Sequence, residues 1–314
     1  MCSTDFKMDK TVMEAVIEPV ARELIESELT ADRLMRHTNN AGNQIYVVTA
    51  GNSPHTMQEI GRLRELSFRD AGGGTGQSVD IDENDTAPDG YNQLIVWDPT
   101  AREIVGGYRF IISRSENTPH LSTEHYFRFS ERFRREILPY TIELGRSFVQ
   151  PMYQGTRLNP KGIYALDNLW DGLGALIVYN PDMRYFLGKV TMYGDYNKKA
   201  RNILVYFLQK YFPDRDNLLE PIYPIELDMD RGELAQLFDG GSYENDYKIL
   251  VREIRSLNEN IPPLINSYMN LSPSMRTFGT VCNPDFGDVE ETGILITIED
   301  MYAKKTERHT RIKS

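Results

Sequence analysis

Cysteine and long hydrophobic runs are scarce in this sequence. Among its 314 residues only Cys2 and Cys282 are cysteines, which excludes a disulfide framework and every zinc or redox site built on a C-x-x-C motif. No apolar run approaches the roughly 18 residues that a membrane-spanning helix needs, and residues 1–10 are too polar for a secretory signal. These absences predict a soluble, cytoplasmic protein.

Positive charge is also in deficit. Asp and Glu number 46 against 35 Lys and Arg, so the formal net charge is −11. A chain this acidic is not expected to use nucleic acid as its main ligand, because a phosphate backbone requires a basic surface. One basic stretch lies near the C-terminus, with Lys304, Lys305, Arg308, Arg311 and Lys313. Such a stretch is usually a solvated tail, and the alternative is an electrostatic contact with an acidic protein or an anionic membrane.

Three patterns that are typical of ligand sites lack essential parts here. Residues 71–76 are rich in glycine but lack the Lys-Ser/Thr pair of a phosphate loop, and residues 80–91 lack the Gly and Glu of a calcium loop. The five histidines show neither metal-ligand spacing nor a Ser-His-Asp pattern. We therefore expect no metal site and interpret residues 71–76 as a flexible active-site flap.

What is present is an apolar fraction of 40% arranged with regular periodicity. We expect an N-terminal helical extension over residues 1–42 and a loop over 71–90. The remaining pattern predicts helices over 57–68, 127–138, 166–177, 200–208 and 247–257, and strands over 44–49, 91–97, 104–112, 140–149, 185–193 and 294–298. This order of elements is typical of an α/β or α+β domain with a mixed sheet, here residues 43–303, followed by a basic tail over 304–314.

The strand at residues 140–149 carries two opposite charges, Glu143 and Arg146, with Gly145 between them. Positions three apart on a regular strand point to opposite faces. Glycine inside a strand often marks a bulge, whose extra residue would bring both charges to one face and leave a backbone N–H unpaired. A carboxylate beside an unpaired N–H could handle a proton while the N–H polarises a carbonyl. The alternative is a structural ion pair.

A longer set of charged residues resembles a known pattern. Arg64 and Phe68 lie one helical turn apart, Asp82 and Asp85 follow the glycine-rich loop, and Arg109 precedes the Glu143 strand. In this order they are similar to the acyl-homoserine-lactone synthases, which have the N-acetyltransferase-like (GNAT) fold and transfer an acyl chain from acyl carrier protein to an amino acid's amine.

A sister family is the closer resemblance: the bacterial ornithine/glycine N-acyltransferases that make lyso-aminolipids, often labelled hemolysin-like. The segments that resemble it are residues 143–147, 169–173, 186–188, 262–268 and 285–286. Residues 288–292 depart from that family, which often has a shorter link there, so glycine and ornithine both stay open as the acceptor. The resemblance implies a GNAT-like, largely antiparallel sheet flanked by helices.

The resemblance also implies roles for individual residues. Glu143 would be the general base, the N–H near Gly145 and Arg146 would bind the oxyanion, and Tyr193 or Tyr196 would protonate the leaving thiolate. Arg109 or Arg146 could bind the acceptor's carboxylate, although pairing of Arg109 with Asp82 or Asp85 is the stronger alternative. The expected substrate-binding residues are Arg64, Phe68, Asp82, Asp85, Arg109, Ser147 and Trp170.

The expected donor is an acyl group on the phosphopantetheine of acyl carrier protein, with no permanently bound cofactor. The turn with which GNAT enzymes hold the pyrophosphate of coenzyme A is missing from residues 150–164, where prolines stand instead. Basic residues that could receive an acidic carrier protein are Arg157, Lys161, Lys198 and Lys199. Since no H-x-x-x-x-D motif is present, a second acyl chain would need a separate O-acyltransferase, and the inner membrane is an expected peripheral contact. The alternatives are a homoserine-lactone signal synthase and a non-catalytic acyl-binding or lytic protein.

Overall fold

An eight-stranded sheet organises the chain in a computed structural model, which describes residues 13–118, 121–154, 160–239 and 241–310. The strand order is β1-β2-β3-β4-β6-β7-β10-β9. Neighbours are antiparallel except for β6 and β7, which are parallel. The strands are β1 (Leu34–His37), β2 (Gln44–Val48), β3 (Asn92–Asp98), β4 (Glu103–Ser113), β6 (Thr141–Val149), β7 (Tyr185–Met192), β9 (Arg276–Asn283) and β10 (Val289–Thr297), and β5 (Phe127–Phe129) pairs separately with β8 (Leu219–Pro221). The expected mixed, largely antiparallel sheet is confirmed.

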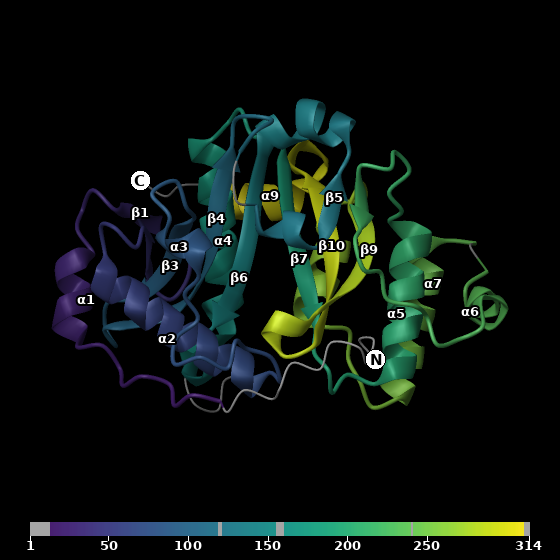
Figure 1. Cartoon of the computed structure of the whole chain (residues 1–314), viewed down its shortest axis with the longest axis horizontal. Coiled ribbons are helices and arrows are strands. Elements are labelled where there is room, and N and C mark those ends of the chain that lie inside the picture. Colours follow the sequence, from purple (N-terminus) through teal and green to yellow (C-terminus); the bar gives the residue numbers. More distant parts are fainter. Residues whose placement is uncertain (1–12, 119–120, 155–159, 240, 311–314) are drawn as a thin grey trace.

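Helices cover both faces of this sheet (Figure 1). They are α1 (Arg22–Glu28), α2 (Pro54–Asp70), α3 (Glu83–Thr86), α4 (Ala165–Tyr179), α5 (Lys198–Tyr211), α6 (Arg231–Leu237), α7 (Tyr243–Ser256), α8 (Pro263–Met269) and α9 (Ala303–Thr310). In the view of Figure 1, α2 crosses in front of the sheet and α4 lies behind it. α2 contacts β6, whereas α4 contacts β3 and β4. The site described below lies between these two layers.

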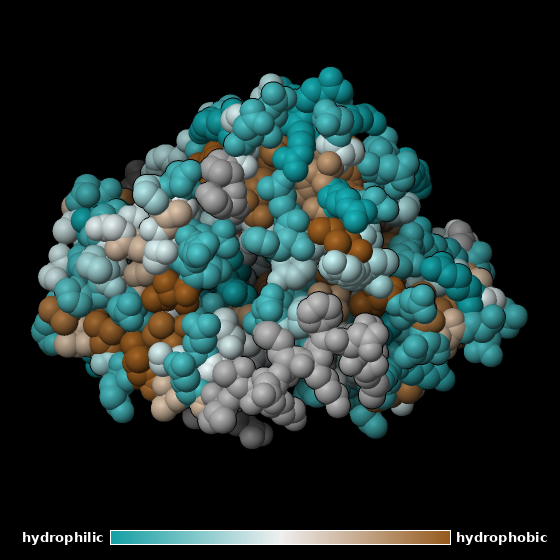
Figure 2. Space-filling view, viewed as in Figure 1, coloured by the Kyte–Doolittle hydropathy of each residue, from teal (hydrophilic) through white to brown (hydrophobic). Residues whose placement is uncertain are grey.

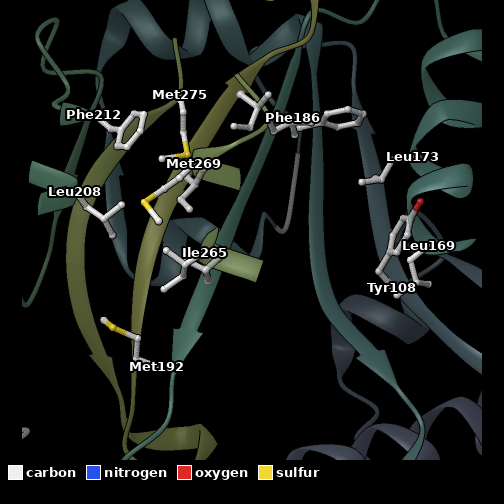
Figure 3. Close-up of a cluster of buried hydrophobic side chains, with 14 of the residues drawn as sticks. Tyr108, Leu169, Leu173, Phe186, Met192, Leu208, Phe212, Ile265, Met269 and Met275 are labelled. Atoms are coloured by element: carbon white, nitrogen blue, oxygen red, sulfur yellow. The ribbon is translucent and has the colours of Figure 1, made fainter. Parts of the chain in front are cut away.

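The core is divided by the sheet. On the α4 side, Tyr108, Leu169 and Leu173 join Leu208 of α5 and Met269 of α8 in one continuous cluster (Figure 3). On the α2 side, one cluster fills the space under α1 and α2, and another lies under β5 and a short 3₁₀ helix, η1 (Ser122–His125). Because apolar side chains cover both faces of the central strands, a charged side chain on them needs a specific partner or a cavity.

Two predicted helical segments contain strands. Residues 34–37, expected within the helical extension, pair with β2 as the edge strand β1, so the extension holds only α1 among its described residues. Residues 127–138 begin with β5 and continue as a short π-helix over Phe133–Ile137. The pairing of β5 with β8 buries Phe127, and this tertiary contact outweighs the local preference of the charged residues that follow.

The predicted basic tail is part of the folded domain as far as Thr310. Residues 303–310 form α9, which packs on α4 at Gly174, where a Cβ atom would lie 2.3 Å from the His309 carbonyl oxygen. The His309 ring contacts Asp171 (Nδ1–Oδ1, 2.8 Å), and Arg36 donates to the His309 carbonyl at 2.7 Å. Arg311 and Lys313 lie outside the described residues.

Hydrophilic residues cover most of the face shown in Figure 2, and hydrophobic residues gather at lower left over the region of α1 and α2. Across the described ranges, no helix is both long and apolar enough to cross a membrane.

Candidate active site

A bulge interrupts β6 where the sequence predicts one. Gly145 pairs with Arg109 and Phe148 pairs with Gly107, so Arg146 and Ser147 together oppose a single residue of β4. The residue in the left-handed conformation is Arg146, with φ 50°, and not the neighbouring glycine. A residue other than glycine in this region stores backbone strain, and such strain is common at functional sites.

β6 and β7 separate at the bulge. Their parallel pairing runs from Thr141 and Tyr185 to Leu144 and Gly188, although β6 continues to Val149 and β7 to Met192. The two ribbons diverge in Figure 1. A cavity of about 1530 Å³ opens in this region, and its lining includes Gly145, Arg146, Ser147 and Val149 on one side and Lys189, Thr191 and Met192 on the other.

The cavity reaches both faces of the sheet, and its two walls differ in chemistry. On the α4 side it is lined by Ala165, Leu166 and Tyr196 and by the segment 261–264. On the α2 side polar and aromatic groups dominate, namely Asp82, Arg109, Ser122, Tyr126, Tyr193, Asn283, Phe286 and Glu291, together with Phe68. An apolar wall suits a hydrocarbon chain, and a polar wall suits a charged small molecule.

Arg64 and Arg109 bind the two aspartates that follow the glycine-rich loop. Asp85 accepts from Arg64 at 3.0 Å and from Arg109 at 3.3 Å, and Asp82 accepts from Arg109 at 2.7 Å. Burial raises the pKa of Asp85, but the charges of Arg64 and Arg109 outweigh it and hold that pKa below its usual range. The alternative of pairing between Arg109 and Asp82 or Asp85 is thus present, with both aspartates, and it occupies the Arg109 guanidinium.

Arg146 is less fully engaged. Its Nε lies 3.1 Å from a carboxylate oxygen of Asp80, and its outer nitrogen is 3.9 Å from Asp82. The guanidinium lies over the Phe286 ring, 4.3 Å from the ring centroid, and its side chain is 19% exposed toward the cavity that it lines. Arg146 therefore has donors that a ligand in the cavity could use.

Glu143 lies on the same face of the sheet as Arg109, but it is not among the residues that line the cavity. Its buried carboxylate accepts from the Tyr91 hydroxyl and from the backbone N–H and hydroxyl groups of both Ser122 and Thr123. These donors fix the first turn of η1 to β6. Lys189, which lines the cavity, donates to the Ser122 hydroxyl at 3.2 Å, so Ser122 connects Glu143 to the cavity.

Sequence reasoning missed several residues of the cavity, among them Lys189 on β7, Glu291 on β10 and Asn283 at the end of β9. Burial lowers the pKa of the Lys189 ammonium, and the negative charge of Glu291 opposes this shift. For Lys189 the available signal was a lone charge inside an otherwise apolar strand, which is costly unless it has a partner or a function. β9 itself was not predicted.

The glycine-rich loop is anchored under the cavity. The buried Glu65 carboxylate accepts from the Thr75 N–H at 3.1 Å and from the Gly76 N–H at 2.8 Å. Gly73 packs so closely on the Tyr193 ring that a Cβ atom there would lie 2.9 Å from it. Burial raises the pKa of Tyr193, and the charge of Glu291 raises it further. Tyr193 therefore keeps its proton at neutral pH, as a proton donor must.

The other predicted site residues are spread over the molecule. Ser147 lines the cavity, whereas Trp170 packs on Tyr268 and His309 and lines a separate small cavity instead. Lys161 is held by Asp98 at 2.8 Å, and Arg157 lies outside the described residues. Lys198 and Lys199 are exposed at the first turn of α5, next to Tyr196 at the cavity.

Comparison with known proteins shows the family to which the chain belongs. Residues 63–160 match the acetyltransferase (GNAT) domain. A glycine N(alpha)-acyltransferase of Bacteroides thetaiotaomicron is 54% identical over 302 residues, 95% of this chain and 90% of that protein. Another from Phocaeicola vulgatus is 52% identical over 302 residues, 95% of this chain and 93% of that protein.

A solved structure of a coenzyme-A-dependent acyl-homoserine lactone synthase, with SAM and isopentyl-CoA, is also similar. The likeness covers 85% of this chain and 88% of that one, with 12% identity and a TM-score of 0.35. The identity and coverage of the two curated relatives, together with the domain match, decide the assignment: this chain is an N-acyltransferase and belongs to the GNAT family that includes the glycine N(alpha)-acyltransferases.

Proposed function

We propose that the protein transfers a fatty acyl group, with or without a 3-hydroxyl, from acyl carrier protein to the α-amine of glycine, giving a lyso-aminolipid. The observation that carries this proposal is the cavity at the split between β6 and β7, with an apolar wall on one side and a charged wall on the other. Two substrates of opposite character must meet in such a reaction. Glycine is favoured over ornithine because both curated relatives are named for it.

Arg146 is the residue that we assign to the acceptor's carboxylate. A guanidinium can bind a carboxylate through two parallel hydrogen bonds, and Arg146 lines the cavity with donors to spare. Arg109 is less suited because Asp82 and Asp85 already occupy it. In this arrangement Arg64, Asp85 and Arg109 form the support behind the site. Asp82 lies between Arg109, at 2.7 Å, and Arg146, at 3.9 Å.

The bulge supplies the groups that the transition state needs. Neither Arg146 nor Ser147 has a partner in the register with β4, and β7 has already separated from β6 at this point. We assign their backbone N–H groups to the oxyanion that forms when the amine attacks the thioester carbonyl. One such donor is typically worth about 10²–10³ in rate. Tyr193, kept protonated by its surroundings, would protonate the departing thiolate.

A carrier protein is the proposed donor because its pantetheine arm carries one phosphate and no adenosine. A short 3₁₀ turn over Pro151–Tyr153 follows β6. It supports a carrier-protein donor because the sequence lacks the pyrophosphate-binding turn in this segment. Lys198 and Lys199 offer a basic landing point next to the cavity, and Lys161 is less available because Asp98 holds it. No permanently bound cofactor is part of this proposal.

The product would be a single-chain lipid. A second acyl chain would require a separate O-acyltransferase, and the product would leave toward the inner membrane, where a peripheral contact of this cytoplasmic enzyme is proposed. The exposed Lys304 on α9 is available for such a contact, whereas Arg308 is paired with Asp167.

The test is reconstitution with purified protein. Hexadecanoyl-carrier protein is incubated with glycine, ornithine, serine or S-adenosylmethionine, and products are identified by mass spectrometry. The proposal expects N-hexadecanoylglycine as the main product. Preferred acylation of ornithine would replace the acceptor, a homoserine lactone would establish a signal synthase, and thioester binding without any turnover would establish an acyl-binding protein.

A further inference from the structure

Two residues that line the cavity each have a buried oxygen atom without a hydrogen-bond partner in the part of the chain that the structure describes. Oε2 of Glu291 and Oδ1 of Asn283 are inaccessible to solvent, and among the described residues neither accepts a hydrogen bond. The two residues are only 6% and 4% exposed, and both line the cavity. Leaving a buried acceptor unsatisfied costs about 1–3 kcal/mol, and more for a charged group, so such atoms call for a ligand that donates to them.

The sheet register places Glu291 and Asn283 on the face of the sheet that carries the charged wall of the cavity. Glu291 of β10 pairs with Thr191 of β7, two residues from Lys189 on the same face. Asn283 pairs with Val289, two residues before Glu291. Tyr193, the proposed acid, is influenced by the charges of both Glu291 and Arg146. Glu291 and Arg146 therefore approach one region of the cavity from opposite sides of the split between β6 and β7.

We propose that Glu291 and Asn283 bind the ammonium group of the amino-acid acceptor and that Glu291 takes the proton that must leave before the amine can attack. This inference rests on the proposed N-acyl transfer and names the residue that activates the acceptor. An ammonium group has three N–H donors, and the two oxygens without partners can each accept a hydrogen bond from it. With the acceptor's carboxylate on Arg146, a zwitterion would span the cavity between an anion and a cation.

The proton balance follows from these positions. The ammonium gives one proton to Glu291, and the neutral amine forms a C–N bond to the thioester carbonyl carbon. The C–S bond breaks as the tetrahedral intermediate collapses. The second nitrogen proton replaces the one that Tyr193 gives to the departing thiolate, and Glu291 returns its proton to solvent.

Glu143 is less suited to this step. Its carboxylate already accepts from five donors and does not reach the cavity directly. A base must lie within hydrogen-bond reach of the proton that it takes, directly or through one water. Glu291 lines the cavity and has an oxygen without a hydrogen-bond partner among the described residues, whereas Glu143 positions η1.

The experiment compares Glu291→Gln with Glu290→Gln. Glu290 is the neighbouring residue of β10, points to the other face and pairs with Arg201, so it is a matched control. With hexadecanoyl-carrier protein and glycine, Glu291→Gln is expected to lower kcat about 10²–10⁴-fold and to raise the KM for glycine, with the KM for the thioester unchanged. Glu290→Gln is expected to keep the wild-type kcat.

A second variant separates chemistry from folding. Glu291→Ala leaves room for a small acid, so added formate should restore part of its turnover, whereas chloride at equal concentration should not. Wild-type turnover in Glu291→Gln, or a thioester KM that rises as much as the glycine KM, would overturn the inference. Failure of formate to restore any turnover in folded Glu291→Ala would also count against it. The proposed function has a separate test, because its failure would appear as wild-type enzyme that makes no N-acylglycine.

Discussion

The guanidinium of Arg146 lies 4.3 Å from the centroid of the Phe286 ring, and Phe286 belongs to the turn between β9 and β10. This contact joins the bulge in β6 to the strand that carries Glu291. The same arginine has a positive φ, so its position depends on neighbours that hold it. Stacking on Phe286 and the ion pair with Asp80 supply that support.

Arg146→Lys should separate binding of the acceptor from stability. Lysine keeps the positive charge near Asp80 but loses the planar fork and the stacking on Phe286. We expect the KM for glycine to rise about 10–100-fold with a smaller change in kcat, because one bidentate interaction is lost. Steady-state kinetics at varied glycine and fixed thioester measure this. An unchanged glycine KM would show that the carboxylate binds elsewhere.

Glu143→Gln should act mainly on stability. The glutamine side chain presents an N–H₂ group toward donors that now meet a carboxylate, so at least one of the five is left without an acceptor. Each unsatisfied buried group costs about 1–3 kcal/mol. A thermal melt should show a clear loss of Tm, and the folded fraction should keep more turnover than Glu291→Gln. If instead Glu143→Gln retained its Tm and lost more activity than Glu291→Gln, Glu143 would be the base.

Asp82 and Asp85 allow an effect on stability to be compared with an effect on turnover. Asp85 is buried between Arg64 and Arg109, so Asp85→Asn leaves two buried guanidinium groups under-compensated, a change that typically costs about 3–5 kcal/mol. The Asp82 side chain is 33% exposed and lines the cavity. We expect Asp85→Asn to lower Tm strongly and Asp82→Asn to lower turnover more than Tm. The reverse order in melts and kinetics would contradict this assignment.

The Asp85 contribution should also depend on pH in a defined direction. Its pKa is held below the usual value in the folded chain, so the unfolded chain binds the proton more readily. The stabilisation is present above the unfolded pKa of about 3.9 and is lost as the pH falls toward the folded value. The difference in Tm between wild type and Asp85→Asn should therefore be constant from about pH 5 to 7 and should narrow below about pH 4. A constant difference down to pH 3 would contradict it.

Local sequence patterns predicted the bulge and the charge pairing that support the site, but they did not predict the contacts between distant strands that complete it. Gly145 between two charges indicated the bulge, and the charges after the glycine-rich loop indicated a partner for Arg109, because each inference needs only neighbouring residues or charge balance. Four of the five donors to Glu143 lie about twenty residues upstream on η1, and Glu291 meets Lys189 only because β10 pairs with β7. Such contacts depend on strand pairings that periodicity cannot specify, and β9, which supplies Asn283, was not predicted at all.

Donor choice can be tested at the start of α5. Lys198 and Lys199 are exposed there, next to Tyr196, whose hydroxyl donates to the Asn260 carbonyl at 3.0 Å on the cavity wall. Reversing both lysines to glutamate should raise the KM for hexadecanoyl-carrier protein and leave Tm unchanged, because exposed charges contribute little to stability.

The effect should be largest at low salt, since screening weakens interactions between exposed charges. Lys304→Glu is the control. It also reverses an exposed positive charge, but on α9, which packs against α4, and it should leave the KM for the carrier protein unaltered. Hexadecanoyl-coenzyme A should be a poorer donor for the wild type, and its use should change less on the reversal, because its phosphates carry negative charge but it has no acidic protein surface. Equal efficiency with both donors, without any dependence on salt, would mean that the enzyme recognises the thioester arm alone and that Lys198 and Lys199 have no part in donor selection.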